Sequence, residues 1–204
     1  MKRAATLKRP LPPGTEDAEP RHSRRRFAGA LGVLLAAPAL LLSRHAPASG
    51  EPSRTLRFDH THTGEKLTVT YSAGDRYVPA ALTEISRFLR DFRTGDVHPI
   101  DPQLLDQLHM LATLSAGMAP AQGTGPFEVI SGYRSPATNG KLREHSTGVA
   151  SRSLHLDGRA IDIRLPRVAL ADLHGAALSL RAGGVGFYPG SNFVHIDTGR
   201  VRRW

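Results

Sequence analysis

The stretch Ser153-Leu-His-Leu-Asp-Gly-Arg-Ala-Ile-Asp162 decides how the rest of this 204-residue chain is interpreted, because it carries half of a possible metal site. His155 can donate an imidazole nitrogen, and Asp162, seven residues later, can donate a carboxylate oxygen. This spacing does not fit one face of a continuous helix. Gly158 can turn the chain, and the alternating run 159–164 predicts a strand that carries Asp162. We therefore expect one ligand on a loop and the other on the strand that follows.

A third ligand is available in a second alternating segment, Val194-His-Ile-Asp197. His195 and Asp197 are two residues apart, so they share one face of a strand. Two histidines and one carboxylate, with one position left for water, are typical of a catalytic zinc site. Taken alone, however, a His beside an Asp is equally consistent with a pair of surface residues.

These residues resemble the signatures of the LAS zinc peptidases, the group that includes D-Ala-D-Ala carboxypeptidases, lysostaphin-like enzymes and the hedgehog fold. The signature Ser-x-His-x-x-Gly-x-Ala-x-Asp is matched in full by residues 153–162, and Ser131-Gly-Tyr-Arg-Ser135 resembles the upstream Arg motif. A longer resemblance, to the periplasmic murein endopeptidase K branch of the group, covers the chain after about residue 53. It rests on the segments His62–Glu65, Phe88–Asp91, Ser131–Asn139, Gly183–Gly186 and Phe193–Gly199.

The composition limits the class of protein. A hydrophobic content of 40% in 204 residues allows one domain with a buried core. The absence of cysteine excludes disulfides and a thiolate zinc site. The net charge is +9, but residues 1–48 hold nine of the 27 basic and three of the 18 acidic residues, which leaves only +3 for the remainder. Because nucleic-acid binding needs a basic face on the domain itself, we expect no nucleic-acid partner.

Residues 1–48 have the features of an export leader. A basic, proline-rich start precedes Ser23-Arg-Arg-Arg-Phe27, which resembles the twin-arginine signature. The apolar run 27–42 has 16 residues, fewer than the roughly 20 that a membrane span needs. Ala46-Pro47-Ala48 offers a small-x-small cleavage site. The resemblance implies export by the twin-arginine translocase to the periplasm, with membrane contact only through this segment; an uncleaved signal anchor is the alternative.

Residues 53–204 are expected to form a single α+β domain, with helices packed on a small, mostly antiparallel sheet. Alternating segments predict a hairpin over 55–71 and strands at 127–130, 159–164, 185–188 and 193–197. Apolar stripes predict helices over 79–93 and 166–181, and residues 136–145 are expected to form a short helix. A further helix begins at Asp101-Pro102, with an expected buried face of Leu104, Leu105, Leu108, Leu111 and Leu114.

A zinc ion held by His155, Asp162 and His195, the ligands that the resemblance implies, would lower the pKa of its bound water to about 7 and polarise a carbonyl. That chemistry suits hydrolysis of an amide, although other divalent ions could occupy such a site in vitro. Arg134 is the candidate for stabilising the oxyanion or holding a substrate carboxylate, and its alternative role is to brace the sheet edge. Ser153 could hydrogen-bond the substrate or cap its own loop.

The general base is the point at which the resemblance weakens. Many relatives place a Glu or His two or three residues before the last ligand, where this chain has Phe193 and Asn192. Asp197 is the candidate base, because it shares a strand face with His195. Its alternative role is to orient that histidine through a hydrogen bond. Asp157, beside the turn, is the next candidate.

The resemblance implies an exported zinc metallopeptidase that hydrolyses peptidoglycan stem-peptide cross-links, such as those that join two diaminopimelate residues. We expect it to be a monomer. A carboxypeptidase that removes D-Ala is the alternative enzyme. A non-catalytic zinc-bearing module that binds cell-wall peptides is the alternative of another class.

Overall fold

The computed structural model describes residues 52–121, 123–145 and 150–204, so the expected leader lies outside the described residues. The strands are β1 (Ser53–His60), β2 (Lys66–Ala73), β3 (Arg76–Tyr77), β4 (Phe127–Ser131), β5 (Ala160–Arg164), β6 (Gly184–Tyr188), β7 (Phe193–Asp197) and β8 (Arg202–Arg203). The helices are α1 (Pro79–Phe88), α2 (Pro102–Ala116), α3 (Pro136–His145) and α4 (Leu170–Leu180), with short 3-10 helices η1 (Leu154–Asp157) and η2 (Pro189–Ser191).

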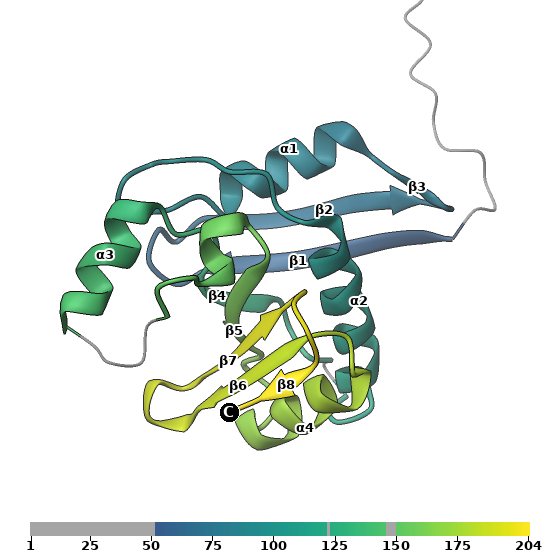
Figure 1. Cartoon of the computed structure of the whole chain (residues 1–204). Coiled ribbons are helices and arrows are strands. Elements are labelled where there is room, and N and C mark those ends of the chain that lie inside the picture. Colours follow the sequence, from purple (N-terminus) through teal and green to yellow (C-terminus); the bar gives the residue numbers. More distant parts are fainter. Residues whose placement is uncertain (1–51, 122, 146–149) are drawn as a thin grey trace, which may run out of the picture. The chain divides into compact units, whose positions relative to one another are not determined.

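The expected α+β class is confirmed, but the sheet is not small. In the described ranges eight strands form one mixed sheet in the order β3-β2-β1-β4-β5-β7-β6-β8 (Figure 1). Five of its seven strand pairs are antiparallel, and β1–β4 and β6–β8 are parallel. The sheet is larger than expected because the β1–β2 hairpin joins β4, and because β3 and β8 extend the edges with two residues each.

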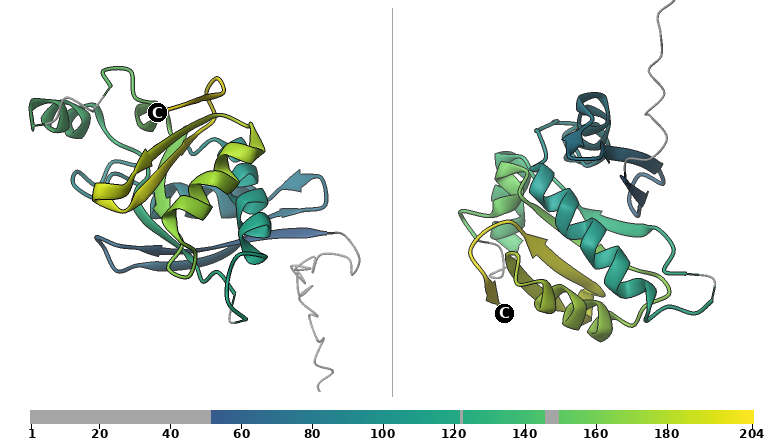
Figure 2. Two further views of the ribbon diagram at one scale, coloured as in Figure 1. Left: turned by 90° about the horizontal axis from the view of Figure 1, so that it is seen from below. Right: turned by 90° about the vertical axis from the view of Figure 1, so that its right-hand side faces the viewer.

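The two faces of the central strands have different environments. Ile161, Ile163, Val194 and Ile196 of β5 and β7 belong to the hydrophobic core, to which α2 and α4 also contribute. The right-hand view of Figure 2 shows these two helices side by side along the sheet. Because side chains alternate along a strand, the residues between these apolar ones point to the other face. The sheet therefore presents part of that other face for a functional site.

Two helix boundaries differ from the sequence-based expectation. α1 ends at Phe88 rather than at residue 93, because the carbonyl of Leu89 accepts a hydrogen bond from the Tyr133 amide at 2.8 Å and the chain turns there. α4 begins at Leu170 rather than at residue 166, because residues 165–168 form a turn that buries Val168 in the core. In both cases a tertiary contact decided the boundary.

α2 confirms the predicted start and corrects one buried residue. The Asp101 carboxylate accepts a hydrogen bond from the Gln103 amide at 3.0 Å and so caps the helix. Leu114 is 44% exposed, contrary to expectation. The buried stripe instead continues from Leu111 to Ser115, four residues on, which leaves Leu114 outside it.

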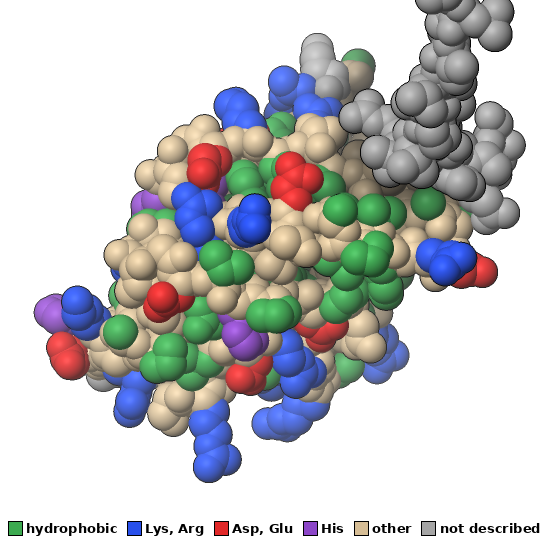
Figure 3. Space-filling model, turned by 90° about the horizontal axis from the view of Figure 1, so that it is seen from above, with side chains coloured by type: hydrophobic (Ala, Val, Ile, Leu, Met, Phe, Trp, Pro, Cys, Tyr) green, Lys and Arg blue, Asp and Glu red, His purple; other side chains and the backbone are tan. Residues whose placement is uncertain are grey.

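The described surface has mixed charge. On the face drawn in Figure 3, basic and acidic side chains are interspersed. No helix within the described residues combines the length and the apolar character that a membrane crossing requires.

Candidate metal centre

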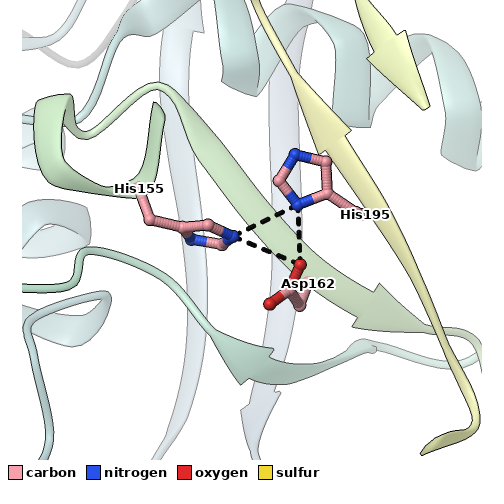
Figure 4. A group of neighbouring side chains, drawn as sticks. All are labelled: His155, Asp162 and His195. Atoms are coloured by element: carbon pink, nitrogen blue, oxygen red, sulfur yellow. Dashed lines mark hydrogen bonds and ion pairs between the residues drawn. The ribbon is translucent and has the colours of Figure 1, made fainter. Parts of the chain in front are cut away.

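Asp162 and His195 face each other across neighbouring strands, because the register of β5 and β7 pairs them directly. His155 reaches the same point from η1, just before β5. The Oδ1 atom of Asp162 lies 3.2 Å from His155 Nε2 and 2.8 Å from His195 Nδ1, and the two nitrogens are 3.2 Å apart (Figure 4). All three side chains are buried. The structure thus brings together the three residues that the sequence singled out.

The donor atoms fit a tetrahedral ion. Ligand atoms about 2 Å from a common zinc in tetrahedral geometry are separated by about 3.3 Å, close to the distances found here. His155 Nδ1 lies 2.6 Å from the carbonyl oxygen of Gly132, which can only accept, so Nδ1 carries the proton and Nε2 offers its lone pair. In His195, Nε2 lies 3.1 Å from Asp197 Oδ2, which leaves Nδ1 directed at the group. Each imidazole is therefore held in the tautomer that suits a metal.

The electrostatics of the group favour the forms that bind metals. Burial lowers the pKa of His155, so this imidazole is kept neutral. Burial acts to raise the pKa of Asp162, but His155, His195 and Arg134 together hold it well below its usual range. Burial also acts to lower the pKa of His195, yet its hydrogen bonds to Asp162 and Asp197 raise it overall. A cation between these groups would replace the proton that the two carboxylates favour on His195.

Asp197 is fully buried and both its oxygens are occupied. Oδ1 accepts hydrogen bonds from the amides of Gly184 at 3.0 Å and Gly199 at 2.8 Å and from Arg202 Nη1 at 3.0 Å. Oδ2 accepts from Arg202 Nη2 at 2.7 Å and from His195. Although burial opposes the effect, these bonds hold the pKa of Asp197 well below its usual range. The geometry favours the orienting role over the role of a base.

Arg134 is tied to the group rather than directed away from it. Its Nη2 forms an ion pair with Asp162 Oδ2, on the carboxylate oxygen that does not face the histidines, and its Nε donates to Ser131 Oγ at 2.9 Å. Its backbone amide donates to the His155 carbonyl at 3.1 Å. Arg134 therefore orients the carboxylate and the histidine segment, and its side chain lines the cleft.

Two glycines allow the histidine segment to approach. Gly158 ends η1 with a left-handed φ of +64°, and a Cβ there would collide with the Pro99 carbonyl oxygen. A Cβ on Gly132 would lie 2.6 Å from the Leu89 carbonyl oxygen. The Gly132 carbonyl, which fixes the His155 tautomer, depends on this close approach.

The group opens into a cleft of about 550 Å³. Among the described residues that line it, Asp162 is the one carboxylate. Ser153 also lines it, and the Ser153 side chain makes no capping hydrogen bond to η1. Asp157 is exposed and does not line the cleft.

Several residues near the group were not found by sequence reasoning. Arg202 is on β8, a two-residue strand without periodicity, and reaches Asp197 only because β8 pairs with β6. Tyr188 and Trp204 form an aromatic wall of the cleft, with Trp204 Nε1 donating to the Tyr188 hydroxyl at 2.7 Å. His62, the first residue of the His62–Glu65 segment of the family resemblance, also lines the cleft. No short motif marks Arg202, Tyr188 or Trp204.

An α+β domain with a buried His–Asp–His group open to a cleft has the features of a metal-dependent hydrolase. A family model described as peptidoglycan L,D-endopeptidase MepK matches residues 48–204, and the chain belongs to this family.

Curated relatives have the name that describes this family model. The peptidoglycan L,D-endopeptidase MepK of Escherichia coli strain K12 is 42% identical over 182 residues, which cover 89% of this chain and 97% of the relative. That of Shigella flexneri has the same identity and coverage. The probable peptidoglycan L,D-endopeptidase MepK of Haemophilus influenzae is 40% identical over 89% of this chain and 95% of its own length. No solved structure matches the chain.

Proposed function

We propose that this chain is a zinc-dependent endopeptidase that hydrolyses stem-peptide cross-links in peptidoglycan, including those between two diaminopimelate residues. The observation that carries the proposal is the convergence of His155, Asp162 and His195, within 3.2 Å of one another, beside a cleft. The 42% identity to a relative named as a peptidoglycan L,D-endopeptidase supplies the substrate class.

In this proposal His155 Nε2, His195 Nδ1 and Asp162 Oδ1 hold the zinc ion. When bound, zinc makes hydroxide available near neutral pH and polarises the scissile carbonyl. Arg134 keeps Asp162 ionised and oriented, and its charge beside the group favours the negative charge that develops on the substrate oxygen. Ser153, whose side chain does not cap η1, is available to hydrogen-bond the substrate backbone.

Asp197 serves in this proposal to orient His195 rather than to remove a proton. Its oxygens already accept hydrogen bonds from two backbone amides, Arg202 and His195, and a base must have an oxygen within reach of the attacking water. Asp157 does not line the cleft. The proposed mechanism therefore uses no carboxylate as general base.

The enzyme acts outside the cytoplasm in this proposal. The Ser23–Phe27 segment directs export through the twin-arginine translocase, which carries folded proteins, and the peptidase domain is formed by residues 53–204. We propose that it acts in the periplasm as a monomer.

Digestion of purified sacculi tests the function and separates the alternatives. The zinc-loaded domain is incubated with sacculi, with and without a chelator, the glycan strands are then cut with a muramidase, and the resulting muropeptides are identified by mass spectrometry. An endopeptidase converts cross-linked dimers to monomers, whereas a carboxypeptidase shortens stems by one D-Ala and leaves dimers intact. Binding to sacculi without any product would show a non-catalytic module and refute the proposal.

A further inference from the structure

The cleft beside the metal group has an excess of positive charge. Four arginines of the described chain line it, Arg93, Arg134, Arg152 and Arg202, against the single carboxylate of Asp162. Arg134 pairs with Asp162, and Arg202 pairs with Asp197. Arg93 and Arg152 form no ion pair with any described residue. Bound zinc would add further positive charge, so the cleft is suited to an anionic ligand.

Arg93 is an exposed residue whose guanidinium packs on an aromatic ring. Its guanidinium carbon lies 4.1 Å from the centre of the Phe92 ring, and Phe92 stacks on His62 with ring centres 4.3 Å apart. The adjacent carboxylate of Asp91 is engaged elsewhere. It accepts hydrogen bonds from the backbone amide of Arg93 at 3.0 Å and from the amide and hydroxyl of Ser135 at 2.9 and 2.7 Å.

The same Asp91 contacts place Arg93 beside the site. They connect the turn that follows α1 to Ser135, the residue after Arg134. Burial lowers the pKa of the Arg93 guanidinium; Asp91 opposes this, and the charge of Arg134 adds to it. An anion beside Arg93 would relieve this repulsion between two guanidinium groups. Arg152, in contrast, has no aromatic or hydrogen-bonded support among the described residues.

We propose that Arg93 binds a free carboxylate of the substrate's stem peptide and so makes the cleft specific for acidic peptides. This inference rests on the proposed function, because it assigns a specificity residue to the same site. Arg134 is occupied by Asp162, which leaves Arg93, whose guanidinium packs on the Phe92 ring, to form a paired hydrogen bond with a carboxylate.

Matched substrates test this assignment. Purified cross-linked muropeptide dimers are compared with dimers in which one stem-peptide carboxylate at a time is converted to a primary amide. For the wild-type enzyme, one such amidation should lower kcat/KM by about 10- to 100-fold, mainly through KM, as expected for a lost hydrogen bond to a charged group. Arg93→Gln should show the same loss on the free carboxylate and no further loss on that amide. Arg93→Lys should retain part of the preference.

The control is Arg87→Gln, which removes an equal charge from the exposed side of α1, outside the cleft. It should behave as the wild type, and zinc content should be unchanged in all variants. A wild-type enzyme that cuts acid and amide dimers equally would overturn the inference, as would Arg93→Gln with its preference intact. A wild-type enzyme that cuts no dimer would instead refute the proposed function.

Discussion

Asp197 decides between two accounts of the site at the scale of a single residue. In Asp197→Asn an amide nitrogen replaces one oxygen, so an N–H group faces a donor of Arg202 together with either His195 or the Gly184 and Gly199 amides. We expect zinc affinity to fall by about 10- to 100-fold, because the orientation of His195 is weakened. The rate should return to near the wild-type value when zinc is in excess. Competition with a chromophoric chelator measures the affinity, and hydrolysis at saturating zinc measures the rate.

Asp172→Asn is the control, because Asp172 is an exposed residue of α4 away from the cleft. Asp172→Asn should change neither the zinc affinity nor the rate of hydrolysis. If Asp197→Asn instead binds zinc normally and remains about 100- to 10,000-fold slower at saturating zinc, Asp197 is the general base and the orienting account is wrong.

At the scale of single residues, the sequence predicted which donor residues converge better than it predicted their hydrogen-bond partners. His155, Asp162 and His195 could be singled out because imidazole and carboxylate groups can bind metals and because the spacing places two of them on strands. The hydrogen bonds that occupy the Asp197 carboxylate could not be foreseen. Their donors, Arg202, Gly184 and Gly199, reach it only after β6, β7 and β8 are assembled.

At the scale of the elements, the turn between η1 and β5 carries a direct prediction. Gly158→Ala places a Cβ at a left-handed φ of +64° and against the Pro99 carbonyl. We expect the free energy of unfolding to fall by about 1–3 kcal/mol from backbone strain, with a further loss where Pro99 must move. Zinc binding should weaken too, since η1 carries His155. Urea unfolding and zinc titration measure the two effects.

Gly175→Ala provides the comparison within α4, where an added Cβ meets nothing within 4 Å. Alanine should be neutral or stabilising there by up to about 1 kcal/mol, because it favours helix over glycine. Equal stability of Gly158→Ala and the wild type would show that the turn does not need glycine.

The elements themselves were largely predictable, and their ends were not. The β1–β2 hairpin, α2 and the β6–β7 pair follow from alternation, a cap and an apolar stripe. α1 stops early because Leu89 is bonded to Tyr133, a contact between segments more than 40 residues apart. β3 and β8 are two residues long, too short for any periodicity, and form because a strand is already present beside them.

At the scale of the whole molecule, the leader carries a prediction about location. Replacing Arg24 and Arg25 with lysine removes the paired guanidinium groups of the Ser23–Phe27 segment and keeps the charge. The precursor should then accumulate in the cytoplasm, which cell fractionation and immunoblotting would show. Replacing Arg21 with lysine, outside the segment, is the control and should not alter export. Normal export of the double variant would rule out the twin-arginine route.

The central claim is that one zinc ion, held by His155, Asp162 and His195, makes this domain an endopeptidase. Its most direct test is the rate of cleavage of cross-linked dimers as zinc is added back to metal-free protein. We predict a rate that rises linearly and reaches its plateau at one equivalent of zinc per chain, with His195→Ala inactive and unable to hold the ion. Full activity in the metal-free protein, or full zinc occupancy and activity in His195→Ala, would contradict the account.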